Sequence, residues 1–139
     1  MTGADNAAQY YSRFGEAAYS AADQMAAAEY LRAHTTAAGR LATVGYESTV
    51  MFLSGRMNAT RFSYALPLVG WRSTPATRNG YQREFMAALA PPPLYIVVGQ
   101  LLIGKPLTGD VFPDLTDLLA RDYVLEQTCG AVQLYRRVR

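Results

Sequence analysis

Residues 94–98 read Leu-Tyr-Ile-Val-Val, an uninterrupted apolar run. Its length suits a strand, and an apolar run without alternation is typical of a strand covered on both faces, as in a parallel sheet with helices on either side. Pro91 ends the helical pattern before this run, and Gly99 follows it. We therefore expect 94–98 to be the central strand of an α/β fold.

Helical and extended patterns alternate along the rest of the chain. Ser20 and Asp23 have the spacing of a capping box, and Asn79 with Gln82 repeats it, so each pair predicts a helix start. The expected elements are a helix from Ser20 to about Thr35, a strand at 41–44, a short helix over 47–53, a strand at 60–64, a surface loop at 68–76, a helix from Asn79 to Leu89, a helix from Pro113 and a terminal hairpin of 123–128 and 132–136.

This order predicts a three-layer α/β/α sandwich. Helices between strands favour right-handed crossovers and a mostly parallel sheet of about five strands, closed by a C-terminal antiparallel hairpin. Ligands of such sheets bind beyond the carboxyl ends of the strands. The segments in that position are 45–47, 65–71 and 99–105.

Composition indicates one packed domain. Half of the 139 residues are apolar or aromatic and 17% are charged, which suits a globule, so we expect a single α/β domain over residues 20–139. The formal net charge of +2 is too small to favour a nucleic-acid partner. The longest nearly apolar stretch, 91–103, is shorter than the about 20 residues that cross a bilayer.

No motif predicts a catalytic centre, a metal site or a cofactor. The segment 99–105 (GQLLIGK) has the spacing of a phosphate-binding loop, but Pro106 stands where such a loop has a Ser or Thr that holds Mg²⁺. His34 is the only histidine, and we expect it in the last turn of the first helix. Cys129 is the only cysteine, and it is expected on a strand as a small buried apolar residue.

Most acidic residues can be explained as helix caps or as part of solvated helix faces, but Glu47 cannot be explained so easily. It follows the first strand directly after Tyr46, and Arg56 and Arg61 lie in the same region of sequence. Two interpretations remain open, a structural ion pair or a polar ligand held at this rim. Tyr46, Glu47, Arg56 and Arg61 are the candidate substrate-binding residues.

Several short motifs follow one another in a recognisable order. They are EYLRAHT at 29–35, VGYES at 44–48, MFLSGRMNATRFSY at 51–64, PPPLYIVV at 91–98 and CGAVQLYRR at 129–137. In this order they resemble the C-terminal extracytoplasmic domain of polytopic membrane glycosyltransferases of the dolichyl-phosphate-mannose protein mannosyltransferase-like superfamily. The resemblance extends from about Ala17 to the end of the chain. Ser48 stands where such proteins often have proline after the glutamate.

The resemblance implies a parent enzyme that transfers a sugar from a polyprenyl-phosphate carrier to an acceptor at the outer face of the membrane. This chain would be an accessory domain of that enzyme, with residues 1–19 as an arm or linker from the membrane part. Its partners would be the membrane-embedded part of the same polypeptide and a lipid-linked sugar or acceptor. The family's catalytic acidic residue lies in a loop between transmembrane helices, so no catalytic residue carries over. The isolated chain is expected to bind sugar or polyprenyl phosphate weakly or not at all, and to transfer nothing.

An alternative from a different class is a free-standing ligand-binding or protein-binding α/β module without catalytic activity. It would use the arginine-bearing, tyrosine-rich surface of the same domain. The length of the natural reading frame distinguishes the two, because only the first requires membrane-spanning stretches upstream.

Overall fold

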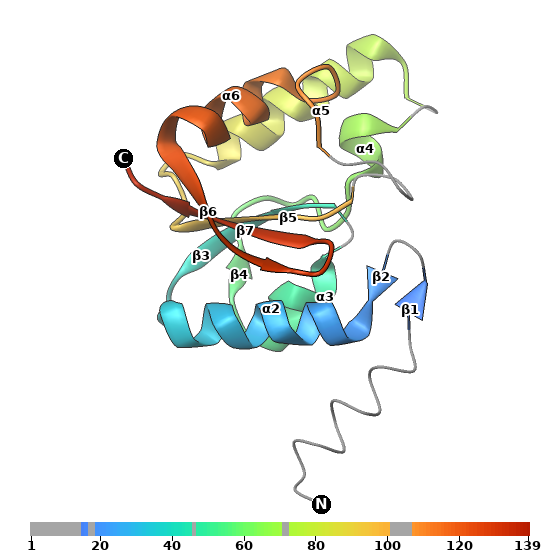
Figure 1. Ribbon diagram of the computed structural model, residues 1–139. Coiled ribbons are helices and arrows are strands. Elements are labelled where there is room, and N and C mark those ends of the chain that lie inside the picture. Colours follow the sequence, from blue (N-terminus) through green and yellow to red (C-terminus); the bar gives the residue numbers. More distant parts are fainter. Residues whose placement is uncertain (1–14, 17–18, 46, 71–72, 101–106) are drawn as a thin grey trace, which may run out of the picture.

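The computed structural model describes residues 15–16, 19–45, 47–70, 73–100 and 107–139. It is an α/β fold built on a five-stranded sheet, with a separate two-stranded ribbon near the N-terminus (Figure 1). The strands are β1 (Gly15–Glu16), β2 (Tyr19–Ser20), β3 (Arg40–Val44), β4 (Met57–Asn58), β5 (Tyr95–Val98), β6 (Tyr123–Cys129) and β7 (Val132–Arg137). The helices are α2 (Ala21–His34), α3 (Ser48–Ser54), α4 (Leu66–Val69), α5 (Pro75–Ala88) and α6 (Pro113–Asp122).

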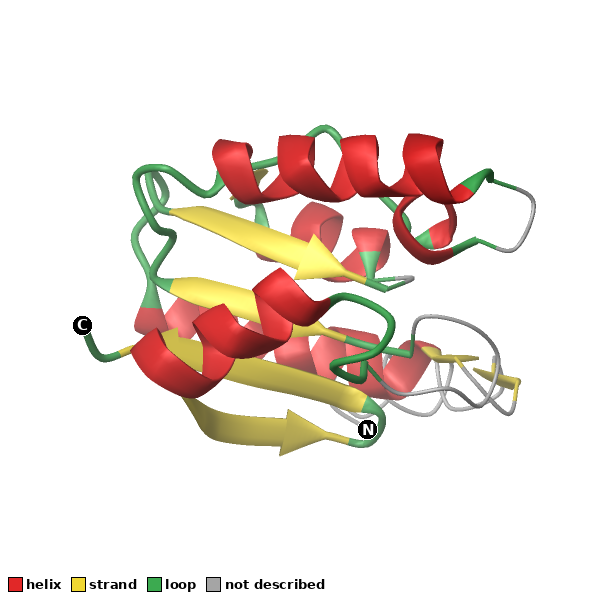
Figure 2. Cartoon of the chain, turned by 90° about the horizontal axis from the view of Figure 1, so that it is seen from above, coloured by secondary structure: helices red, strands yellow, loops and turns green. Residues whose placement is uncertain are grey.

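Helices cover both faces of the larger sheet. In Figure 1, α2 and α3 lie below the sheet, and α4, α5 and α6 lie above it. Figure 2, seen from above, shows two helices on this face, one running along the strands at one edge of the sheet and the other lying obliquely over the strands. None of the described helices combines the length and the apolar character that crossing a membrane requires.

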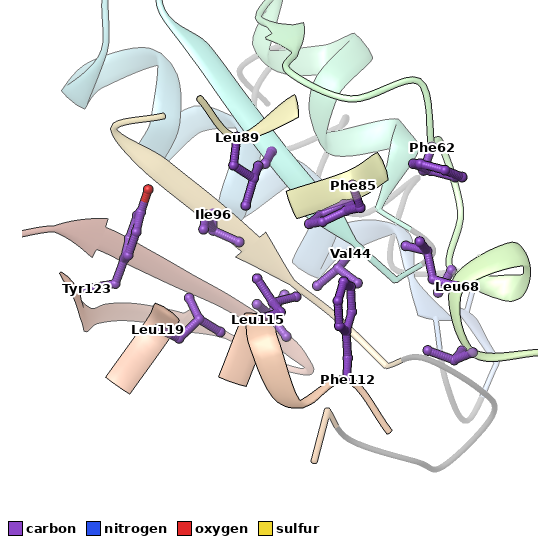
Figure 3. Packing of buried hydrophobic residues seen from close by; sticks show 14 residues of the cluster. Val44, Phe62, Leu68, Phe85, Leu89, Ile96, Phe112, Leu115, Leu119 and Tyr123 are labelled. Carbon is purple, nitrogen blue, oxygen red and sulfur yellow. The ribbon is translucent and has the colours of Figure 1, made fainter. Parts of the chain in front are cut away.

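Two apolar clusters form the core, one on each face of the sheet. Alternate residues of each strand point to opposite faces, so Ile96 and Val98 join the cluster under α5 and α6, while Tyr95 and Val97 join the cluster under α2. Figure 3 shows the first cluster, in which the Phe85 and Phe112 rings meet edge to face at 5.5 Å. Both rings are fully buried, which fixes α5 and α6 to the same sheet.

The expected central strand is confirmed. β5 is the third strand in the order β4-β3-β5-β7-β6, and all four of its residues are buried. The helix starting after Ser20 is confirmed as well, with the Ser20 side chain accepting a hydrogen bond from the Asp23 amide at 3.3 Å. The short helix after β3, the last helix and the terminal hairpin also lie where the sequence predicts them.

The expectation of a mostly parallel sheet is wrong, because the sheet is mixed. β3 pairs in parallel with β4 and with β5, but β5 and β6 both pair antiparallel with β7. The cause is the C-terminal hairpin. It adds two strands to the sheet directly beside β5, rather than closing a parallel sheet that is already complete.

The strand expected at 60–64 is also wrong. The strand that pairs with the outer edge of β3 is the earlier and shorter β4, and the chain then turns. The Asn58 side-chain oxygen accepts from the Thr60 amide at 3.1 Å, and the Thr60 hydroxyl accepts from the Phe62 amide at 3.2 Å. These local bonds occupy the amide groups that a longer strand would have used in the ladder.

The segment 68–76, expected as a loop, contains helical residues at both ends. α4 extends into it as far as Val69, and α5 begins at Pro75, earlier than the Asn79 start expected from the sequence. Thr74 is the true cap, since its hydroxyl accepts from the Thr77 amide at 3.2 Å. Proline at the first helical position fits this start, because its missing N–H has no helical partner there.

Candidate functional site

Glu47, the centre of the predicted site, lies where two neighbouring parallel strands end. β3 ends at Val44 and β5 ends at Val98, and beyond them the Gly99 amide donates to the Val44 carbonyl at 2.9 Å. Glu47 is the N-cap residue of α3 and is only 2% exposed. After β3 the chain continues to β4 at one edge of the sheet, and after β5 it continues to β6 at the opposite edge. This is therefore the switch point at which open α/β sheets commonly bind ligands.

Two glycines make space for the Glu47 side chain. A Cβ atom at Gly45 or at Gly99 would overlap the Glu47 carboxylate. Gly45 also has φ +136°, a backbone conformation that residues with side chains rarely adopt. Each of the two strands is thus followed by a glycine that lets the backbone approach a buried acidic group.

Tyr46, the second predicted site residue, falls outside the described residues. Segment 101–106, which carries most of the loop that resembles a phosphate-binding motif, falls outside them too. Of that motif the structure describes Gly99, which is buried, and Gln100, which is partly exposed.

Arg56 lies at the opposite end of β3 from Glu47. It precedes Met57, which is in register with Arg40, the first residue of that strand. Its Nε donates to the Thr35 hydroxyl at 2.8 Å, and its terminal nitrogens donate to the carbonyls of Thr35 and Ser54 at 2.9 and 3.0 Å. Arg56 therefore closes the C-terminal end of α2, where carbonyl groups lack helical partners and a cation suits the helix dipole.

Arg61 lies on the flank of the molecule beside α5. It makes a bidentate ion pair with Glu84, in which its terminal nitrogen donates at 2.9 Å, and its guanidinium stacks over the Phe62 and Tyr81 rings at 4.9 and 5.7 Å from their centroids. The hydrogen bond from Arg61 lowers the pKa of Glu84. Arg61 thus has partners of its own, and the structure does not bring Arg56 and Arg61 together with Glu47.

A small pocket opens next to Arg61. Its volume is about 160 Å³, and its lining is half aromatic: Arg61, Phe62, Ser63, Tyr64, Pro67 and Tyr81. Tyr64 is 49% exposed, although it is a large side chain with an apolar ring. The sequence predicts Arg61 as a binding residue but not its surroundings, because Tyr81 and Glu84 come from a helix about 20 residues later.

A polar network that the sequence does not predict lies on the α2 face of the sheet. Glu126 accepts hydrogen bonds from the hydroxyls of Tyr95 and Tyr30, the latter at 3.0 Å, and from the Arg136 Nε at 2.5 Å. The pairing of β6 with β7 shifts register between Leu125 and Gln127, and Glu126 lies in this bulge. The sequence around Glu126 does not predict this bulge, because the bulge forms only when β6 pairs with β7.

The charges of this network support one another. Hydrogen bonds from Tyr95, Arg136 and Tyr30 lower the pKa of Glu126. Burial, together with the bond to Glu126, raises the pKa of Tyr95 and of Tyr30. The network thus holds an ionised carboxylate between two neutral phenols and one cation.

A second, larger groove lies between α6 and the terminal hairpin. It has a volume of about 370 Å³, and its lining includes Leu119 on the helix and Val124, Leu125 and Tyr135 on the strands. Its walls are mostly apolar, without a charged side chain among the lining residues. The groove can hold an apolar group, and its polar lining side chains are Thr116, Gln133 and the tyrosines.

His34 and Cys129 occupy structural positions. His34 lies in the last turn of α2 as predicted, where its Nδ1 lies 2.7 Å from the Tyr30 carbonyl oxygen and its ring stacks on Tyr30. Cys129 is buried on β6 as predicted, and burial raises the pKa of its thiol. Across the described ranges, no group of three or more His, Cys, Asp or Glu side chains is placed to hold a metal ion.

No family model, curated protein or solved structure matches this chain.

Proposed function

We propose that this chain is an accessory domain of a membrane glycosyltransferase. The parent enzyme would transfer a sugar from a polyprenyl-phosphate-linked donor to an acceptor at the extracytoplasmic face of the membrane. The domain would form a three-layer α/β/α scaffold that packs against the membrane-embedded part of the same polypeptide and contributes no catalytic residue.

The observation that carries this proposal is that the Arg56 side chain links two of the sequence motifs by hydrogen bonds. The motif EYLRAHT ends at Thr35, and the motif MFLSGR ends at Arg56, 21 residues later. The Arg56 guanidinium joins the two motifs through the Thr35 hydroxyl and carbonyl and through the Arg32 carbonyl, which it reaches at 3.4 Å. Residues that carry the resemblance thus form one unit of packed structure, as expected for motifs that specify a domain rather than a reaction.

A second observation supports a partner surface near this unit. Phe52 and Met57 are the most exposed large apolar side chains of the described residues, at 84% and 74%. Both belong to the segment 51–64 that carries the resemblance. Side chains of this kind on a folded surface are common contacts of a partner protein. In the proposal they face the membrane-embedded part of the enzyme.

The test combines the natural reading frame with an activity assay. The proposal expects about a dozen apolar stretches of spanning length to be encoded upstream of this chain. It also expects the purified 139-residue chain to form no product from a polyprenyl-phosphate sugar and an acceptor. A complete reading frame that begins at Met1, or sugar transfer by the purified chain, would overturn the proposal.

A further inference from the structure

We infer that the pocket beside Arg61 is a binding site for a neutral sugar residue. The site consists of the aromatic walls Tyr64 and Tyr81, the Arg61–Glu84 pair and the Ser63 hydroxyl. It deepens the proposed function and rests on it for the expectation that a glycan is the natural ligand.

The aromatic walls provide the apolar half of sugar recognition. One face of a pyranose ring carries C–H groups with partial positive charge, and the face of an aromatic ring is electron-rich. Tyr64 is half exposed, and Tyr64 and Tyr81 both line the pocket. A tyrosine hydroxyl can donate to and accept from the hydroxyl groups of a ligand.

The ion pair provides the polar half. Arg61 uses two of its N–H groups on the two carboxylate oxygens of Glu84, and further N–H groups of the guanidinium remain. Stacking on Phe62, which lies at the margin of the core cluster in Figure 3, and on Tyr81 fixes the plane of the guanidinium before any ligand arrives. The guanidinium of Arg61 offers donors and the carboxylate of Glu84 offers acceptors side by side. This arrangement matches neighbouring hydroxyl groups of a sugar, because each hydroxyl both donates and accepts.

The charge of the pair decides between a sugar and an anion. Arg61 and Glu84 are 64% and 44% exposed in their side chains, so an ion pair here adds little to stability. The guanidinium is already neutralised by a carboxylate in bidentate contact, and a phosphate group would meet that carboxylate at close range. A neutral polyol avoids this repulsion. The pocket volume of about 160 Å³ is close to the size of one monosaccharide unit.

The test is a titration of the ¹⁵N-labelled 139-residue chain, followed by NMR. The probes are methyl glycosides of common neutral hexoses and pentoses, and inorganic phosphate serves as the anionic probe. We expect saturable shifts of the Arg61 side-chain Nε–H and of the backbone amides at 61–64, with a dissociation constant in the millimolar range for at least one glycoside. Phosphate should leave these signals unchanged.

Matched variants assign the effect to the pocket. Tyr64→Ala and Arg61→Gln should each weaken the binding roughly tenfold. Tyr64→Phe should keep most of it, because the ring remains. Phe52→Ala removes an exposed aromatic ring elsewhere, and Arg121→Gln removes an exposed ion pair elsewhere, so both should bind like the parent chain.

Three results would overturn the inference: no saturable shift with any glycoside, stronger binding of phosphate than of glycosides, or shifts that persist in Tyr64→Ala. The outcome is separable from the proposed function. If the chain binds no sugar but its natural reading frame encodes membrane-spanning stretches upstream, the sugar site is wrong and the proposed accessory role is still supported. Sugar binding in a chain without such stretches supports the site and removes the accessory role.

Discussion

Arg56 shows how one side chain can connect distant motifs. Its hydrogen bonds reach both the end of α2 and the end of α3, and the residue is only partly exposed. Arg56→Ala leaves several carbonyl groups without this partner, so we expect the free energy of unfolding to fall by about 2 kcal/mol. Urea denaturation measures the change. Arg121→Ala is the matched control, because its ion pair with Asp122 is exposed and should change stability by less than about 1 kcal/mol.

A loss of the same size in both arginine variants would contradict the structural role assigned to Arg56.

Gly99 is the second position where one residue decides the local structure. Gly99→Ala places a methyl group against the Glu47 carboxylate, which is itself buried, so we expect a loss of about 1–3 kcal/mol in urea denaturation. Removing the carboxylate in Gly99→Ala/Glu47→Ala should make the two effects non-additive, because the clash is gone. Gly109→Ala, where an added Cβ meets nothing within 4 Å, is the control and should be close to neutral. Additive losses in the double variant would show that the two residues do not interact.

At the scale of elements, local signals predicted most helices and strands. Ser20, Gly130 and the apolar run in β5 each act within a few residues, so the sequence shows their effect directly. β4 is different, because its two residues become a strand only by pairing with β3. The bulge in β6 likewise depends on the neighbouring strand β7. These elements are decided by tertiary pairing, which patterns along the chain do not record.

The Glu126 network predicts a pH dependence. Hydrogen bonds from Tyr95, Arg136 and Tyr30 lower the pKa of Glu126 in the folded state below its ordinary value. A carboxyl group whose pKa is lower in the folded than in the unfolded chain increases the free energy of unfolding at pH values above its unfolded pKa. This contribution is lost as the pH falls through the pKa of the folded state. We therefore expect the parent chain to lose more stability than Glu126→Gln when the pH is lowered from about 6 to about 3. Denaturation curves along this pH series give the comparison, with Glu29→Gln as an exposed control.

Equal acid sensitivity of the parent chain and Glu126→Gln would show that the network does not bind the carboxylate more strongly in the folded state.

At the scale of the whole molecule, one of the two core clusters joins the sheet to α5 and α6. Phe85 is fully buried and its ring lies 5.5 Å from that of Phe112 and 6.2 Å from that of Phe62. Phe85→Ala should cost about 3–5 kcal/mol through lost burial and the cavity that remains. Unfolding should stay a single transition by circular dichroism and by tryptophan fluorescence alike. Two separate transitions would show that the faces of the sheet unfold independently.

The candidate site was less predictable than the fold. Glu47 was predicted from its position after an expected strand, and Arg61 from its nearness to Glu47 in the sequence. The partners of Arg61 come from α5 and those of Arg56 mainly from α2. Sequence spacing placed the four residues in one region, whereas the direction of β3 and β4 separates Arg56 from Glu47 by the length of a strand. The tyrosine-lined pocket needed both α5 and the turn after β4 in place.

The most direct test of the account removes the domain from the enzyme to which it is proposed to belong. Membranes carrying the natural polypeptide, with and without residues 20–139, are assayed for sugar transfer from a polyprenyl-phosphate donor at several acceptor concentrations. We predict that the shortened polypeptide transfers sugar more slowly or with a higher KM for the acceptor, and that the separate domain forms no product. Equal transfer with and without the domain, or transfer by the domain alone, would contradict the account.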